Sequence, residues 1–261
     1  MMNMIRADVY RITRGWGWWV TFLIAFALSA GIAVLGILDL DGASLGGQGA
    51  PAFIVTGANM LESMGYLGLV LMLFAAPVFS IVSSPIFQDK TEKNEVTWGI
   101  SRTTLYVSRL IVSAVWCLLI MLVLFGTATV IATLYGGLGD VEAGFWMNRL
   151  TSFGAQWFML VAAAWIGIFV TFAVKNPFVS FEIWGAIVAL PTAMGMGAAM
   201  GGAGGRVPFI MYFDITTAMV AFSDLGALDT RRIAIGLAVG VFWAFVPTIV
   251  GLIRYQSKEI S

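Results

Sequence analysis

Long apolar runs separated by short polar segments dominate the pattern of this chain. Six of these runs are close to or above the roughly 20 apolar residues that a helix needs to cross a bilayer. The predicted spans cover residues 16–38, 63–87, 106–135, 149–174, 178–200 and 231–253. The pattern therefore predicts an all-α integral membrane protein with one transmembrane domain over residues 1–261.

Residues 1–15 have a different pattern, in which apolar and charged side chains fall on different sides of a helix. The predicted apolar face carries Ile5, Val9, Ile12 and Trp16, and the arginines that lie away from it are Arg6, Arg11 and Arg14. A helix of this kind lies along a membrane surface with its apolar face in the lipid. The sequence thus predicts an interfacial helix before the first span.

A charged segment over residues 88–105 interrupts the apolar pattern between the second and third predicted spans. It carries both signs of charge, at Asp89, Lys90, Glu92, Lys93 and Glu95, followed by Arg102. Charged side chains are costly in hydrocarbon, so this segment must lie in water or against another protein. The interpretation that fits best is a cytoplasmic helix that binds a separate partner protein. This helix would lie between the pair of spans 1–2 and the pair 3–4.

The stretch 201–230 is the difficult one to assign. Its apolar middle, residues 207–222, is short for a span and contains Asp214. A re-entrant or interfacial cap on the outer side, before the sixth span, fits better than a seventh span.

Composition supports a lipid environment. Hydrophobic residues make up 60% of the chain and charged residues only 11%, against about 25% charged in soluble domains. The net charge is zero and no basic run is present, so nucleic acid is not an expected partner. The chain has no histidine, and Cys117 is its one cysteine. We therefore expect no His-based catalysis, and neither a metal nor a cofactor held by this chain itself.

The basic residues predict the orientation. With six spans and both termini on one side, ten of the 14 Lys and Arg residues fall on that side and four on the other. An excess of Lys and Arg marks the cytoplasmic side, so both termini are predicted to be cytoplasmic. The expected location is the bacterial plasma membrane.

Glycine-rich motifs bear on whether the chain carries catalytic or nucleotide-binding chemistry. Residues 137–140 spell the GxGD of intramembrane aspartyl proteases, but Asp140 falls in an outer loop beside Glu142, where a turn is the simpler interpretation. The chain contains no GxxxxGK[ST] motif, so it is not expected to bind ATP through a phosphate loop.

Three further positions are candidates for a cavity or an interface. Gly236 and Gly240 form a GxxxG pattern, which permits close helix packing either inside the bundle or between two copies. Glu182 lies shortly after Asn176-Pro177, a typical helix start. Its carboxylate is either stabilised by the positive helix end or part of the lining of a transport cavity.

The polar segment also carries a family resemblance. Residues 92–102, EKNEVTWGISR, together with Tyr106 and Ser108-Arg109-Leu110-Ile111, resemble the first cytoplasmic loop of ABC transporter permeases of the type-two exporter superfamily. The branch it most resembles includes the bacteriocin and lantibiotic immunity permeases. The chain differs from that pattern in lacking Gly-Thr after the acid and in having Arg109 where lysine is usual.

This resemblance implies a transport subunit that is not itself an enzyme. It would export an amphipathic peptide, an antibiotic or a lipid-like compound and would pair with a second copy or a similar permease. ATP and magnesium would be bound by separate cytosolic ATPase subunits. The segment 88–105 would contain the coupling helix that docks on them, through Glu92, Asn94, Glu95, Val96, Trp98, Gly99, Ile100, Ser101 and Arg102.

Two other classes of function remain open from the sequence. One is a membrane-embedded enzyme that uses the acidic residues predicted on the outer side, with or without a divalent metal. Those residues are Asp140, Glu142, Asp214, Asp224 and Asp229. The other is a membrane scaffold or sensor that transports nothing.

Overall fold

A computed structural model describes residues 2–40, 56–65, 68–88, 97, 99–200, 214–215, 218–219, 222 and 230–257. All regular secondary structure in the described part is helical, as the sequence predicts. Its helices are α1 (Met2–Arg14), α2 (Trp16–Leu40), α3 (Gly57–Gly65), α4 (Gly68–Leu73), α5 (Ala75–Gln88), α7 (Arg102–Gly136), α8 (Phe145–Val174), α9 (Pro177–Met200) and α11 (Thr230–Ser257).

Five stretches of the described part are long and apolar enough to cross a membrane. They are Trp16–Ile37, Val70–Phe87, Arg102–Gly136, Phe145–Val174 and Ile233–Ser257. In α9 the apolar stretch whose side chains are described is the shorter Pro177–Val188. The prediction of a multi-pass helical membrane protein is confirmed, and the count of six spans stays a prediction.

Local sequence explains where the helices begin and end. Ser101 caps α7, because its hydroxyl accepts a hydrogen bond from the Thr104 backbone N–H at 3.1 Å. Lys175 ends α8 in the left-handed conformation, with φ 61°. The side-chain oxygen of Asn176 then accepts from the Phe178 N–H at 3.0 Å, which starts α9 at Pro177 as the sequence predicts.

The second predicted span is shorter than expected. Residues 63–65 belong to α3, so the span proposed over 63–87 begins later, at Val70. It is also broken into α4 and α5 at Phe74. Pro77 explains the break, because its ring clashes with the carbonyl four residues earlier and so ends α4 at Leu73.

The long helices α7 and α8 form the centre of the bundle. The principal neighbours of α7 are α2 and α3, while α8 packs against α11, α5 and α9. Indole groups join neighbouring helices: Trp165 Nε1 donates to the Leu110 carbonyl at 3.1 Å and Trp184 Nε1 to the Ala163 carbonyl at 2.9 Å. The helices α2 and α11 bury much less of their surface than α8 and expose many large apolar side chains, as expected for helices in contact with lipid.

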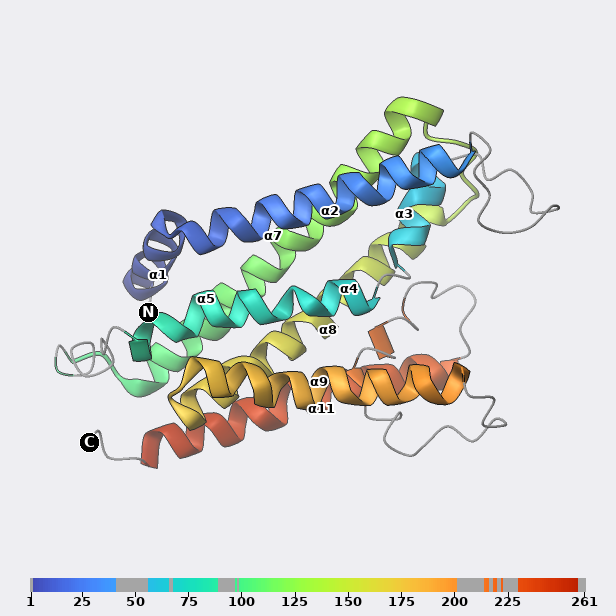
Figure 1. The fold of residues 1–261 in the computed structure, drawn as a ribbon. Helices are drawn as coiled ribbons and strands as arrows, with labels where there is room; N and C mark the ends of the chain where they lie inside the picture. Colours follow the sequence, from blue (N-terminus) through green and yellow to red (C-terminus); the bar gives the residue numbers. More distant parts are fainter. Residues whose placement is uncertain are drawn as a thin grey trace.

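Figure 1 shows how the helix ends are distributed. Helix α1, the end of α5, the start of α7 and the end of α11 all lie at the same end of the bundle. We call this the terminal end of the bundle, and the end formed by α3 and the α7–α8 connection the distal end.

Candidate functional site

The terminal end contains the described part of the predicted coupling segment. Gly99 has a φ of +83°, a conformation that favours glycine. Ile100 is half-buried and packs against the core, and Ser101 caps α7. Glu92, Asn94, Glu95, Val96 and Trp98 lie outside the described residues, so their role in coupling stays a prediction.

Arg102 ties the first turn of α7 to the last turn of α11. Its Nη1 donates to the backbone carbonyls of Tyr255 at 3.2 Å and Gln256 at 3.1 Å. The Gln256 side chain returns a bond from Nε2 to the Thr103 hydroxyl at 2.8 Å. A cation placed at the carbonyl end of a helix is favoured by the helix dipole, so this contact holds the two helix ends together.

Three aromatic rings pack beneath this contact. Phe172 of α8 lies edge-to-face against Tyr106, with ring centroids 5.0 Å apart, and against Tyr255, at 4.9 Å. Gly251 lets α11 approach Tyr106, since a Cβ atom there would lie 2.5 Å from the tyrosine hydroxyl oxygen. The first turns of α7 are therefore packed against both α8 and α11.

A buried ion pair attaches α1 to α7. The Arg109 guanidinium contacts the Asp8 carboxylate, and both side chains are almost completely buried. Ser108 donates from Oγ to the second carboxylate oxygen of Asp8 at 3.3 Å, and Arg11 lies 3.3 Å from the first. Four polar groups thus meet where the N-terminal helix crosses α7.

The sequence reasoning missed Asp8, although a signal for it exists. The surface of α1 that packs on the bundle is formed by Met4, Asp8 and Ile12, spaced four residues apart. Of the residues predicted on the lipid-facing side, Val9 and Trp16 are exposed, whereas Ile5 and Ile12 pack against the core, so the predicted apolar face is wrong at those two positions. Arg109 lies two turns inside an apolar span and requires an acidic partner, and Asp8 is an acid on the protein-facing side of α1.

The three residues proposed for a cavity or an interface have different surroundings. Gly236 and Gly240 are buried and pack against side chains of the same chain. A Cβ atom added at Gly236 would lie 2.7 Å from the Phe222 ring, and one added at Gly240 would lie 2.7 Å from the Met159 side chain. Glu182 is exposed on α9. A role of these residues between two copies stays a prediction.

Of the five acidic residues proposed for a membrane-embedded enzyme, the structure describes three. Asp140 and Glu142 are exposed in the α7–α8 connection, Asp214 is buried, and Asp224 and Asp229 lie outside the described residues. Within the described ranges, no three His, Cys, Asp or Glu side chains lie close enough to hold a metal ion.

Comparison with known proteins adds one finding to this geometry. Residues 5–191 match the model of a family described as ABC-2 family transporter protein. The matched segment covers more than half of the chain and runs from α1 into α9. A search of curated proteins finds no match.

Proposed function

The chain belongs to the ABC-2 family of transporter proteins and is therefore a membrane subunit of an ABC transporter; from this premise we propose that it works as a bacterial exporter. Transport would draw its energy from ATP hydrolysed on separate cytosolic subunits, because the sequence has no phosphate-binding loop. ATP and magnesium would then be bound by the partner.

The observation that carries this proposal is the contact between Arg102 and the end of α11. Helix α7 begins directly after the predicted coupling segment, and Arg102 joins its first turn to Tyr255 and Gln256. A partner that moves residues 88–101 would consequently move α7 together with α11. The Asp8–Arg109 pair would carry the same motion to α1.

Docking on the partner would use the part of the segment around Trp98. Apolar side chains such as Val96 and Trp98 would anchor it, and charged side chains such as Glu92 and Glu95 would form a polar rim. Ile100 supports this division, since it packs against the core of the chain and so leaves Val96 and Trp98 as the apolar anchors.

The membrane topology that goes with this function has six spans and two cytoplasmic termini. Helix α9, with 24 residues, is long enough to serve as the fifth span. The terminal end would face the cytoplasm, and residues 201–230 would form a cap on the outer side. Exposed Trp16 and Trp19 at the start of α2 fit the aromatic belt of an interface.

The proposed cargo is an amphipathic peptide, an antibiotic or a lipid-like compound, as in the immunity-type permeases that the segment 92–102 resembles. Two permease copies, or this chain and a similar one, would enclose the path. Glu182 is exposed on α9 and would line that path or the contact between the copies.

Co-expression with the ATPase of a neighbouring gene tests the proposal. We expect a complex with two membrane subunits, and ATP-dependent movement of an amphipathic peptide across vesicles that contain it. The chain purified alone should not hydrolyse ATP. Robust hydrolysis by the isolated chain, or the lack of any complex with the ATPase, would contradict the proposal.

A further inference from the structure

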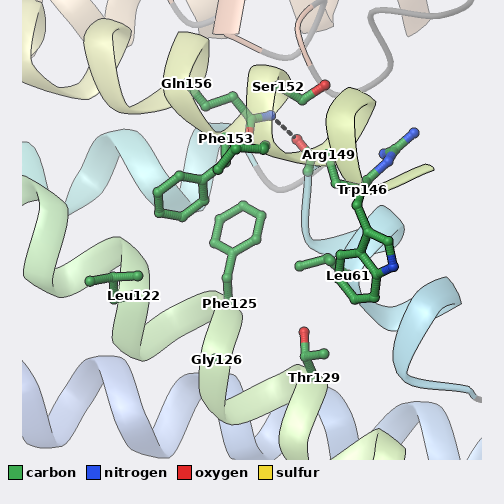
Figure 2. A pocket seen from close by; sticks show the side chains of 12 residues that line it. Leu61, Leu122, Phe125, Gly126, Thr129, Trp146, Arg149, Ser152, Phe153 and Gln156 are labelled. Carbon is green, nitrogen blue, oxygen red and sulfur yellow. Dashed lines mark hydrogen bonds between the residues drawn. The ribbon is translucent and has the colours of Figure 1, made fainter. Parts of the chain in front are cut away.

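A cavity of about 310 Å³ opens at the distal end of the bundle, between α3, α7 and α8. Figure 2 shows the side chains that line it, with the rings of Phe125 and Phe153 lying next to each other. Their centroids are 5.4 Å apart in an edge-to-face arrangement. A volume of this size is at the lower end of the range for small-molecule sites, about 300–1,000 Å³.

The cavity opens sideways, toward the surface that faces lipid. Leu122 and Leu150 line it and expose 51% and 69% of their surface to the surroundings of the chain. Gly126 also lines it, is exposed, and has open space where a side chain would be. A molecule in the surrounding bilayer can therefore enter without crossing the bundle.

The lining combines a cation and an exposed tryptophan near the helix ends with a mostly apolar interior. Toward the helix ends the lining residues include Thr129 of α7 and Trp146 and Arg149 of α8. Deeper in the bundle they are Leu122, Phe125 and Phe153, together with Ser152 and with Gln156, whose side chain already donates to the Gly65 carbonyl at 2.7 Å. An interfacial tryptophan with a buried cation above an apolar interior matches the order of groups in a lipid, where a polar head lies above a hydrocarbon chain.

Two polar groups in the shallow part can receive a ligand. The Thr129 hydroxyl points into the cavity in Figure 2, is buried, and has no hydrogen-bond partner among the described residues. A buried hydroxyl without a partner is costly. Arg149 is 9% exposed, and its Nη2 lies 3.6 Å from Oε1 of Glu62. Its guanidinium carries five N–H donors, of which one carboxylate accepts at most two in a bidentate pair.

We propose that this cavity binds one phospholipid of the membrane, with an acyl chain packed against Phe125 and Phe153 and the phosphate against Arg149. The Thr129 hydroxyl donates to an oxygen of the head group or of the acyl ester. Arginine is suited to phosphate because its planar group can form two parallel hydrogen bonds. The site requires neither the ATPase nor transport, so it can fail or stand independently of the proposed function.

Filling the cavity provides the main test. In Gly126→Phe the new ring enters the empty space at the mouth, and its Cβ meets no atom within 4 Å. The matched control is Gly154→Phe, on an exposed position of α8 that also has nothing within 4 Å and does not line the cavity. Both variants place the same bulk on a helix that faces lipid, so only the cavity differs between them.

The probe is phosphatidylcholine with a photoactivatable diazirine on one acyl chain, mixed into nanodiscs that contain the full chain. Mass spectrometry then locates the labelled residues. We expect labels on residues 122–129 and 146–153 in the unaltered protein and in Gly154→Phe. In Gly126→Phe labelling of these segments should fall about tenfold, which corresponds to about 1.4 kcal/mol of binding free energy. Equal labelling in Gly126→Phe and the unaltered protein would overturn the site.

A second probe, diacylglycerol with the same photoactivatable chain, isolates the phosphate. We expect the unaltered protein to prefer phosphatidylcholine and Arg149→Gln to label equally with both probes. Glu62→Gln should change labelling in the opposite direction, raising it with phosphatidylcholine, because Arg149 loses its competing carboxylate. If Arg149→Gln keeps the preference while remaining folded by thermal unfolding, or if Glu62→Gln lowers labelling, the phosphate assignment is wrong.

Discussion

Asp8 and Arg109 form an ion pair in which both side chains are buried, and this pair joins the N-terminal helix α1 to the long central helix α7. Arg109 lies two turns after Arg102, the residue that joins α7 to the end of α11. The first turns of α7 are therefore attached to both terminal helices of the chain. This is the arrangement expected of an element that transmits motion.

Asp8→Asn should destabilise the protein strongly. The substitution keeps the shape of the side chain but leaves the Arg109 charge buried without its partner, which typically costs about 3–5 kcal/mol. We expect a clear fall in the thermal unfolding temperature of the chain in detergent. The exposed arginine Arg6, on the same helix, supplies the control Arg6→Gln, which should unfold at the unaltered temperature.

A double substitution separates the charge from the packing. Replacing a buried ion pair by apolar side chains is often neutral or stabilising. Asp8→Leu with Arg109→Leu should therefore be more stable than Asp8→Asn alone. If the double variant is less stable than Asp8→Asn, the attraction between the two charges outweighs the free-energy cost of burying them.

The class of the protein and most of its elements could be predicted from the sequence, because lipid imposes a simple rule on apolar length. A helix before the first span, the start of α9 at Asn176-Pro177 and the spans in α2, α7, α8 and α11 all follow from local pattern, and the interfacial position of α1 stays a prediction. The break at Phe74 was missed because Pro77 lies within an apolar run, where hydropathy alone predicts an uninterrupted span. Proline breaks the helix through its backbone geometry, which hydropathy does not reflect.

The contacts of the candidate site were predictable only in part. Ser101 and Arg102 could be picked out because they lie at the edge of a polar segment. Asp8 was overlooked because its partner Arg109 is distant along the chain and pairing depends on how α1 crosses α7. The same limit applies to the distal cavity, which three separate helices create together.

Trp98→Ala should weaken binding of the ATPase. Truncating a tryptophan anchor in a protein interface typically costs about 2 kcal/mol or more, which corresponds to a loss of roughly 30-fold in affinity. Co-purification with the ATPase measures this effect, and the amount of chain in the membrane should not change. Asp140→Ala, in the exposed α7–α8 connection, is the control and should bind the ATPase normally. If Trp98→Ala leaves both assembly and transport unchanged while Asp140→Ala abolishes activity, the outer-face enzyme becomes the better interpretation.

Arg102→Ala should separate assembly from transport. The substitution removes both bonds to the end of α11 while leaving the segment before it intact. We expect normal co-purification with the ATPase but a severalfold lower rate of ATP-dependent transport into vesicles, because hydrogen bonds that involve a charged group contribute about 1.5–3 kcal/mol each. Arg254→Ala, an exposed cation in the last turn of α11, should keep the unaltered rate. Unchanged transport in Arg102→Ala would rule out coupling through this contact.

Reporter fusions test the topology. A reporter that is active only in the cytoplasm should be active when fused before Met2 and after Ser257, since α1 and the end of α11 lie at the same end of the bundle (Figure 1). A fusion in the connection at Glu142 should be inactive, because this connection lies at the distal end. Activity at Glu142 with none at the termini would invert the orientation and place residues 88–105 outside.

Gly240→Leu distinguishes packing inside the chain from contact between two copies. The added side chain would meet Met159 and Phe158 of α8 at 2.7 and 2.8 Å, and overpacking of this kind typically costs about 1–3 kcal/mol. We therefore expect a lower unfolding temperature and an unchanged oligomeric state. Gly154→Leu, where nothing lies within 4 Å, should be neutral or stabilising by up to about 1 kcal/mol through helix propensity. If Gly240→Leu instead dissociates a dimer while the single chain keeps its stability, the glycine belongs to an interface between copies.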